Sequence, residues 1–251
     1  MKDSHPYFNN GELDSNQLSE EKEKLISRAW GYSQLNMHKE AVDECKKLVS
    51  LYPDDPASFI ELGLYCEESG ETEKAIKYYK YAIKKFPQYS RLYINLGYCF
   101  EKYKKRNDMA MVCYEKALQL DPYDEWALNN TAVMLQAEGK WKEAISYYEK
   151  SYEACKRSGI AAGQIMHNLA WAYYRVKNYR KAWHMFNSFA AECPDYDNGS
   201  VHSDFGCVNY KMGHYREALE LVEKGLSLYP DSRRYQRLYR VVSKKINNGQ
   251  R

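Results

Sequence analysis

Three asparagines recur along the chain at similar intervals. Asn95, Asn130 and Asn168 are separated by 35 and 38 residues. Each amide side chain carries a donor and an acceptor, which matches the paired N–H and C=O groups of an extended peptide backbone. A row of such amides could hold a polypeptide segment whatever its side chains, although asparagine also caps helices and bonds to solvent. The first chemistry that the sequence offers is therefore recognition of a protein backbone, with a structural role as the alternative.

The asparagines lie within a repeating pattern of small residues, alanines and prolines. Six small residues are each followed by an alanine twelve or thirteen positions later, and five of these alanines by a proline after another twelve. Successive alanines are 34, 35, 34, 38 and 36 residues apart, which is the period of a helix-turn-helix repeat. The small residues are Ala29, Gly63, Gly97, Ala132, Ala170 and Gly206, the alanines are Ala41, Ala75, Ala110, Ala144, Ala182 and Ala218, and the prolines are Pro53, Pro87, Pro122, Pro194 and Pro230.

This pattern resembles the tetratricopeptide repeat (TPR) family. In six repeats that begin at Lys22, Pro56, Ser90, Glu125, Gly163 and Gly199, the eighth place is always Gly or Ala, and Ala stands at the twentieth place, shifted by one residue to Ala110 in the third repeat. The twenty-fourth place, with the same one-residue shift in the third repeat, is aromatic in four repeats, whereas Cys45 and Val222 replace the aromatic in the first and last. The resemblance implies an all-α fold, a right-handed TPR superhelix (an α-solenoid) of paired antiparallel helices.

We expect one solenoid over residues 19–246, between tails that the composition predicts to be disordered. The repeats are predicted near residues 22–55, 56–89, 90–124, 125–162, 163–198 and 199–232, followed by a capping helix at 233–246. The polar tails are residues 1–18 and 247–251. Additional residues around Cys155 to Gly159 lengthen the interval between two alanines and could extend a helix by about one turn.

The resemblance also implies a binding surface, because the first helices of TPR arrays line a concave groove. If places 4, 8 and 11 of a first helix pack against its partner, places 2, 6, 9 and 13 point away from that face at 100° per residue. We call the surface formed by these places the inner wall. Its aromatic side chains could anchor a ligand or pack against the next repeat. The predicted peptide-binding groove consists of Asn95, Asn130, Asn168, Arg91, Tyr98, Trp126, Trp171, Tyr174 and Glu61.

The charges on the inner wall favour some ligands over others. Glu61, Glu67 and Glu68 make the second repeat acidic and suggest a ligand with a basic residue. The TPR class that clamps chaperone tails has Lys at place 5, where this chain has isoleucine in three repeats, so that ligand is not favoured.

No catalytic motif is present in the sequence. The chain has no Gly-rich phosphate loop, HExxH or GxSxG motif, and its seven cysteines include no CxxC pair. His167 and His202 have no metal-ligand spacing to each other or to a carboxylate. We therefore expect no enzyme activity, no cofactor and no metal. The polar N-terminus and the absence of a long apolar run predict a cytoplasmic protein without membrane insertion.

The C-terminal stretch from Asp231 holds seven Lys or Arg residues and one acid. We expect a basic stripe that faces solvent, opposite an apolar stripe that caps the last repeat. The basic stripe is Arg233, Arg237, Arg240 and Lys244, and the apolar stripe is Tyr235, Leu238, Tyr239, Val242 and Ile246. Such a face could meet an acidic protein or nucleic acid, but nucleic acid is the least favoured partner.

The sequence predicts a protein-interaction module that binds an extended peptide in its concave groove, as an adaptor or assembly factor. The alternative is a structural subunit or self-associating scaffold that uses its outer faces and forms homo-oligomers or larger complexes. In that case the groove could be filled by the chain's own tail, in which Tyr7 and Phe8 are the candidate contacts.

Overall fold

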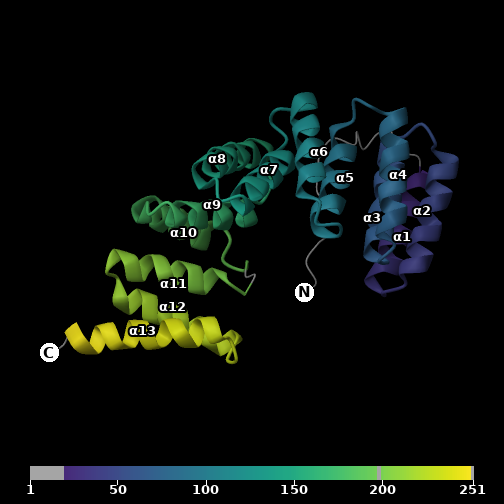
Figure 1. The fold of residues 1–251 in the computed structure, drawn as a ribbon. Coiled ribbons are helices and arrows are strands. Elements are labelled where there is room, and N and C mark those ends of the chain that lie inside the picture. Colours follow the sequence, from purple (N-terminus) through teal and green to yellow (C-terminus); the bar gives the residue numbers. More distant parts are fainter. Residues whose placement is uncertain (1–19, 197–198, 250–251) are drawn as a thin grey trace. The chain divides into compact units, whose positions relative to one another are not determined.

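The structure is a computed structural model that describes residues 20–196 and 199–249. Within these ranges the chain forms thirteen helices and no strand (Figure 1). The all-α prediction is therefore confirmed, and the helices follow one another as pairs joined by short turns. The pairs are α1 (Glu20–Gln34) with α2 (His38–Leu51), α3 (Pro56–Glu68) with α4 (Thr72–Lys85), α5 (Ser90–Lys102) with α6 (Asn107–Leu120), α7 (Glu125–Ala137) with α8 (Trp141–Ser158), α9 (Gly163–Arg175) with α10 (Tyr179–Glu192), and α11 (Val201–Met212) with α12 (Tyr215–Leu228), and α13 (Arg233–Gly249) follows them.

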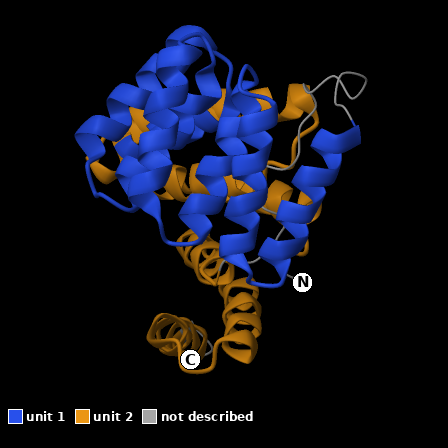
Figure 2. Ribbon diagram, turned by 90° about the vertical axis from the view of Figure 1, so that its right-hand side faces the viewer, with its two compact units in different colours: residues 1–134 blue, residues 135–251 orange. Residues whose placement is uncertain are grey.

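Two compact units divide the chain, unit 1 at residues 1–134 and unit 2 at residues 135–251 (Figure 2). The division falls inside α7, in the fourth repeat. The single solenoid over residues 19–246 stays a prediction. The predicted tail at residues 1–18, with Tyr7 and Phe8, lies outside the described residues. Helix α13 runs to Gly249, past the predicted end of the capping helix at residue 246.

In the second and third repeats, close approach of the two helices depends on glycine at the eighth place. A Cβ atom added to Gly63 would lie 2.2 Å from Cε1 and Cζ of Tyr79, the residue at the twenty-fourth place. At Gly97 the added Cβ would lie 2.6 Å from Cε1 of Tyr114. Carbon atoms in contact are normally about 3.5–4.0 Å apart. The small residue therefore makes room for the buried ring of the second helix.

The tyrosine at the twenty-fourth place also donates a hydroxyl hydrogen bond to the twelfth place of its own repeat. The pairs are Tyr79 with Glu67 (2.8 Å), Tyr114 with Glu101 (2.8 Å) and Tyr148 with Gln136 (3.1 Å). Glu67 was expected on the acidic inner wall, but it is only 7% exposed and bonded to Tyr79. The prediction for this residue is wrong, because the tyrosine hydroxyl draws its carboxylate into the repeat.

Left-handed residues make the turns between paired helices. Gly70 has φ +78°, and Asn36 takes the same region with φ 58°; glycine and asparagine both tolerate this conformation. Lys105 and Lys177 adopt φ 51° and 64° in the third and fifth repeats. These two lysines carry backbone strain that a glycine would relieve.

Helix α8 is longer than the second helices of the other repeats. It has 18 residues, whereas α2, α4, α6, α10 and α12 have 14 each. It ends at Gly159, whose φ is 71°. The additional residues around Cys155 therefore add about one helical turn, as expected from the sequence.

Helix α13 packs on α11 and α12 at the end of unit 2. Tyr235 and Val242 are fully buried there, which agrees with a capping role for the apolar stripe. Tyr239, expected in the same stripe, is 39% exposed. A 100° step per residue carries Tyr239 to the edge of the packed face, so the buried stripe is narrower than predicted.

Candidate functional site

In unit 1, the inner-wall position with the most unusual surroundings is Asn95 on α5. The residue is 1% exposed, between the buried residues Ile94 and Leu96. Its side-chain Nδ2 and Oδ1 atoms have no hydrogen-bond partner among the described residues. A buried polar group without a partner costs about 1–3 kcal/mol, so the fold maintains an unfavourable amide here. Asn95 is thus more enclosed than the predicted open groove position.

The other two asparagines of the predicted row have local partners. Asn130 on α7 is partly exposed, and its Oδ1 accepts a hydrogen bond of 3.2 Å from Nδ2 of Asn129. Asn168 on α9, in unit 2, accepts a bond of 2.9 Å from Nε2 of Gln164. The three positions are therefore chemically unequal, and only Asn95 has both amide atoms unsatisfied.

Aromatic and charged side chains surround the inner wall of unit 1. Trp126 on α7 is partly buried and packs against the hydrophobic core. Tyr98 is held by Lys102, whose Nζ lies 2.6 Å from the tyrosine hydroxyl and 4.9 Å from the ring centroid. Arg91 and Glu61 are partly exposed. The wall therefore combines partly open aromatic surface with charges of both signs.

Asp124 directly precedes α7 and is the carboxylate near Arg91. Its Oδ1 accepts hydrogen bonds from the backbone N–H groups of Trp126 and Ala127, at 3.0 and 2.9 Å, which is an N-cap. Burial raises the pKa of Asp124 to about 6, against the opposing effects of the Ala127 N–H and of Arg91. Part of the Asp124 population is therefore protonated in mildly acidic solution.

In unit 2, the predicted aromatic residues lie together. Trp171 and Tyr174 of α9 stack with ring centroids 4.8 Å apart and an interplanar angle of 14°. The guanidinium of Arg234 on α13 lies 5.6 Å from the Trp171 ring, within range of a cation–π interaction. The inner-wall aromatics of unit 2 thus meet a cation that the groove prediction omitted.

Arg234 is held in turn by a buried carboxylate. Asp204 on α11 is 3% exposed; its Oδ1 pairs with Arg234, and its Oδ2 lies 3.0 Å from Nε2 of His167 on α9. The network joins three helices of unit 2. Sequence spacing does not predict this contact, because folding brings together residues that lie 37 positions apart.

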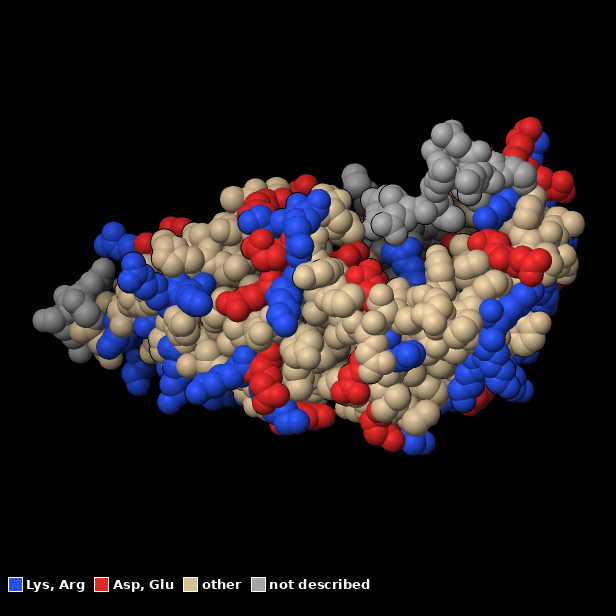
Figure 3. All heavy atoms as spheres, turned by 90° about the horizontal axis from the view of Figure 1, so that it is seen from above, with Lys and Arg blue, Asp and Glu red and all other residues tan. Residues whose placement is uncertain are grey.

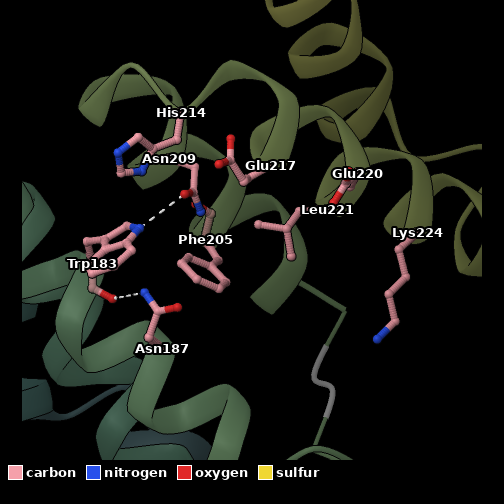
Figure 4. Close-up of a pocket in the computed structure, with 9 residues that line it drawn as sticks. All are labelled: Trp183, Asn187, Phe205, Asn209, His214, Glu217, Glu220, Leu221 and Lys224. Atoms are coloured by element: carbon pink, nitrogen blue, oxygen red, sulfur yellow. Dashed lines mark hydrogen bonds between the residues drawn. The ribbon is translucent and has the colours of Figure 1, made fainter.

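A separate hollow of about 660 Å³ lies between α10, α11 and α12 (Figure 4). Trp183, Phe205 and Leu221 supply its apolar surface, whereas Glu217, Glu220 and Lys224 are exposed at its margin. Trp183 donates its indole N–H to Oδ1 of Asn209 at 3.2 Å. The lining residues are Trp183, Asn187, Phe205, Asn209, His214, Glu217, Glu220, Leu221 and Lys224.

The residue type at Asn209 is the feature of the sequence that distinguishes this hollow. This residue stands at the eleventh place of the last repeat, where the other repeats carry an apolar or aromatic residue. Those residues are Tyr32, Cys66, Phe100, Leu135 and Tyr173. The polar Asn209 accepts the Trp183 indole N–H at this place, which an apolar residue could not do.

Metal sites, membrane-spanning helices and surface charge are the other features of the described residues that bear on function. No group of three or more His, Cys, Asp or Glu side chains in residues 20–196 and 199–249 could hold a metal ion. None of the helices described is long and apolar enough to span a bilayer. On the face shown in Figure 3, acidic and basic side chains are interspersed with uncharged ones.

Comparison with known proteins gives the same architecture. Models described as tetratricopeptide repeat match residues 59–89, 90–124 and 123–188. The Homo sapiens Cell division cycle protein 16 homolog is 23% identical over 238 residues, which cover 79% of this chain and 38% of that protein. The present chain thus spans well under half of that relative.

Two solved structures show the same fold. The APC/C hetero-tetramer Cut9–Hcn1 matches with a TM-score of 0.75 and 19% identity, over 88% of this chain and 42% of that chain. Pseudomonas aeruginosa PilF matches with a TM-score of 0.74 and 20% identity, over 87% and 96% of the two chains. Together with the repeating small residues and the thirteen helices of the described ranges, the three repeat-model matches over residues 59–188 show that the chain belongs to the tetratricopeptide repeat family.

Proposed function

We propose that this protein binds an extended segment of another protein along its inner wall and acts as a non-catalytic adaptor or assembly factor. Membership of the TPR family and similarity to Cell division cycle protein 16 homolog support a role in protein interaction. The observation that carries the peptide-binding part of the proposal is the buried, unsatisfied amide of Asn95.

The Asn95 amide has the chemistry that a peptide backbone requires. Because Asn95 is 1% exposed, the inner wall must open locally before a ligand can reach it; one N–H donor and one C=O acceptor on the ligand would then satisfy both side-chain atoms. Such a pair would recover the cost of the unsatisfied amide, which gives the bound state an advantage that the free protein lacks. Partly exposed Tyr98 and Trp126 are aromatic surfaces that could hold ligand side chains nearby.

The relatives suggest the kind of partner. Cut9 is described in a hetero-tetramer with Hcn1, so at least one protein of this fold assembles with a different polypeptide. For the present chain, which covers 42% of the Cut9 chain, a partner within a multi-protein assembly is part of the proposal. The seven cysteines are all free, and this fits the reducing environment of a cytoplasmic protein.

A second candidate function uses the outer surface. The hollow around Trp183 is lined by the second helices α10 and α12 and by Phe205 and Asn209 of the first helix α11, none of which stands at an inner-wall place. Its volume of about 660 Å³ is within the range of ligand sites in proteins. A scaffold that docks other subunits, or a second copy of itself, through this surface would not need Asn95.

Affinity capture from the native cell separates the two functions. Asn95→Ala should remove partners that bind the inner wall, whereas Trp183→Ala should leave them in place. Asn130→Ala is a matched control that should remove fewer partners, because the Asn130 amide already accepts a hydrogen bond from Asn129. If Trp183→Ala removes the partners and Asn95→Ala does not, the outer-surface function replaces the first.

A tail-occupied groove is tested by deleting residues 1–19. Should Tyr7 and Phe8 fill the inner wall, the deletion would increase the affinity for a captured partner segment. An unchanged affinity would remove this alternative.

A further inference from the structure

A second hollow in unit 2 has a chemical character unlike that of the Trp183 hollow. Its volume is about 410 Å³, and it lies between α11 and α13. Three arginines and three apolar or weakly polar residues form its lining. These residues are Cys207, Arg233, Arg234, Arg237, Leu238 and Val241.

The lining is strongly cationic and contains no acidic residue. Arg233 and Arg237 are exposed and form no ion pair with any residue that the structure describes. The nearby carboxylate of Asp204 is already shared between Arg234 and His167. Two guanidinium groups of this hollow therefore remain available for an external anion, and guanidinium groups bind carboxylates in a bidentate manner.

One side of the hollow is held in place before any ligand arrives. Arg234 contacts the Trp171 ring and pairs with Asp204, and Asp204 in turn is fixed by His167 at 3.0 Å. These contacts draw on α9, α11 and α13. A positioned cation loses less conformational freedom on binding than a free surface arginine does.

The apolar part of the hollow restricts the kind of anion. Leu238 is partly buried, and Val241 is 42% exposed, beside Cys207 on α11. A nucleic-acid backbone presents phosphates and sugars, which are polar and gain little from contact with an aliphatic surface. A peptide can place an acidic side chain on the arginines and a neighbouring apolar side chain on Leu238 and Val241.

We propose that the hollow between α11 and α13 is a binding site for an acidic peptide segment that carries an apolar residue next to its Asp or Glu. The site is in unit 2 and does not use Asn95, so the Asn95 variants test the proposed function separately from it. Arg233 and Arg237 are thereby given a ligand, whereas the sequence predicts them in a solvent-facing stripe that could meet an acidic protein or nucleic acid.

The test uses the full chain and a labelled short peptide in which Asp and Glu alternate with Leu. A matched peptide carries Asn and Gln in place of the acids, and a thymidine oligonucleotide and inorganic phosphate serve as competitors. Fluorescence anisotropy measures binding at low and moderate salt, because an ion-paired complex should weaken as salt rises.

Two double variants with the same loss of charge on the same helix are compared. Arg233→Gln with Arg237→Gln should weaken binding of the acidic peptide at least about tenfold. Arg240→Gln with Lys244→Gln, which lie outside the lining, should change it less than about twofold. Circular dichroism melting confirms that both variants fold, and Arg237→Lys should recover part of the lost affinity.

Three results would overturn the proposal. Equal losses in the two double variants would indicate diffuse charge, and equal binding of the Asn/Gln peptide would show that the acids do not matter. Tighter binding of the oligonucleotide than of the acidic peptide would identify a nucleic-acid surface. In each case, the effect of Asn95→Ala on the inner-wall partner would remain as an independent result.

Discussion

Replacing Gly63 with alanine tests the packing rule of the repeats most simply. The added Cβ would lie 2.2 Å from two ring carbons of Tyr79 and 2.6 Å from its hydroxyl oxygen. Tyr79 is fully buried and its hydroxyl is bonded to Glu67 at 2.8 Å. The ring therefore has no free space to move into, and α3 and α4 must separate.

The expected loss follows from two opposing contributions. Overpacking a buried interface costs about 1–3 kcal/mol and sometimes more, and a contact 1 Å or more inside the normal separation belongs at the upper end of that range. Alanine recovers about 1 kcal/mol relative to glycine in a helix. We expect Gly63→Ala to destabilise α3 and α4 by about 2 kcal/mol.

Two other glycines provide graded controls in the same chain. Gly31 in α1 has no atom within 4 Å of an added Cβ, so Gly31→Ala should stabilise its helix by about 0.5–1 kcal/mol. Gly206 faces Val222 with a Cγ2 distance of 3.2 Å, so Gly206→Ala should be nearly neutral.

Native-state hydrogen exchange measures these effects locally, because a repeat protein loses stability mainly in the altered repeat and its neighbours. Tyr79→Leu should partly relieve the Gly63→Ala clash, and the double variant should therefore lose less than the two single variants together. Stabilisation by Gly63→Ala, or losses that add without coupling, would refute the reasoning.

Three further predictions concern charge and turn geometry. Burial raises the pKa of Asp124 from 3.8 to about 6, so the folded state binds the proton more tightly than the unfolded state, and the parent protein should lose about 1–3 kcal/mol of stability as pH rises from 4 to 7. Asp124→Asn should not show this loss. A difference in melting temperature between the two proteins that stays the same at every pH would contradict the prediction. Asp204→Asn should weaken the packing of α13 by about 1–3 kcal/mol, since His167 and Arg234 lose a shared charged acceptor. Unchanged hydrogen-exchange protection of α13 would show that the network does not contribute to its stability. Lys105→Gly should raise the denaturant midpoint by an amount equivalent to about 1 kcal/mol, because φ at this position is 51°, and a lower midpoint would mean that the lysine side chain makes a larger contribution than its strain.

Local rules made much of the fold accessible from sequence. The eighth-place glycines, the left-handed turn at Gly70 and the one-turn extension of α8 follow from side-chain size, backbone conformation and residue count. Each depends on residues within one repeat, so no contact between repeats is needed to predict it.

The parts that sequence reasoning missed depend on contacts between repeats or on side-chain orientation. His167 and Asp204 meet only when α9 and α11 pack. Glu67 turned toward Tyr79 because a tyrosine hydroxyl needs an acceptor. The three asparagines share one place in the repeat, yet Gln164 and Asn129 bond to two of them and leave Asn95 different. Helical periodicity cannot distinguish these cases.

We propose that a bound ligand supplies the hydrogen bonds that the Asn95 amide lacks among the described residues. Asn95→Leu has a similar branched shape but removes the donor and the acceptor, and it is compared with Asn130→Ala. The decisive measurement is the affinity of a captured partner segment together with the free energy of unfolding of unit 1.

We expect Asn95→Leu to raise the free energy of unfolding of the free protein by about 1 kcal/mol or more and to lower its affinity for the partner segment at least about tenfold. Asn130→Ala should change the affinity less. A protein that is destabilised by Asn95→Leu while its affinity is unchanged would contradict the claim and make Asn95 a structural residue.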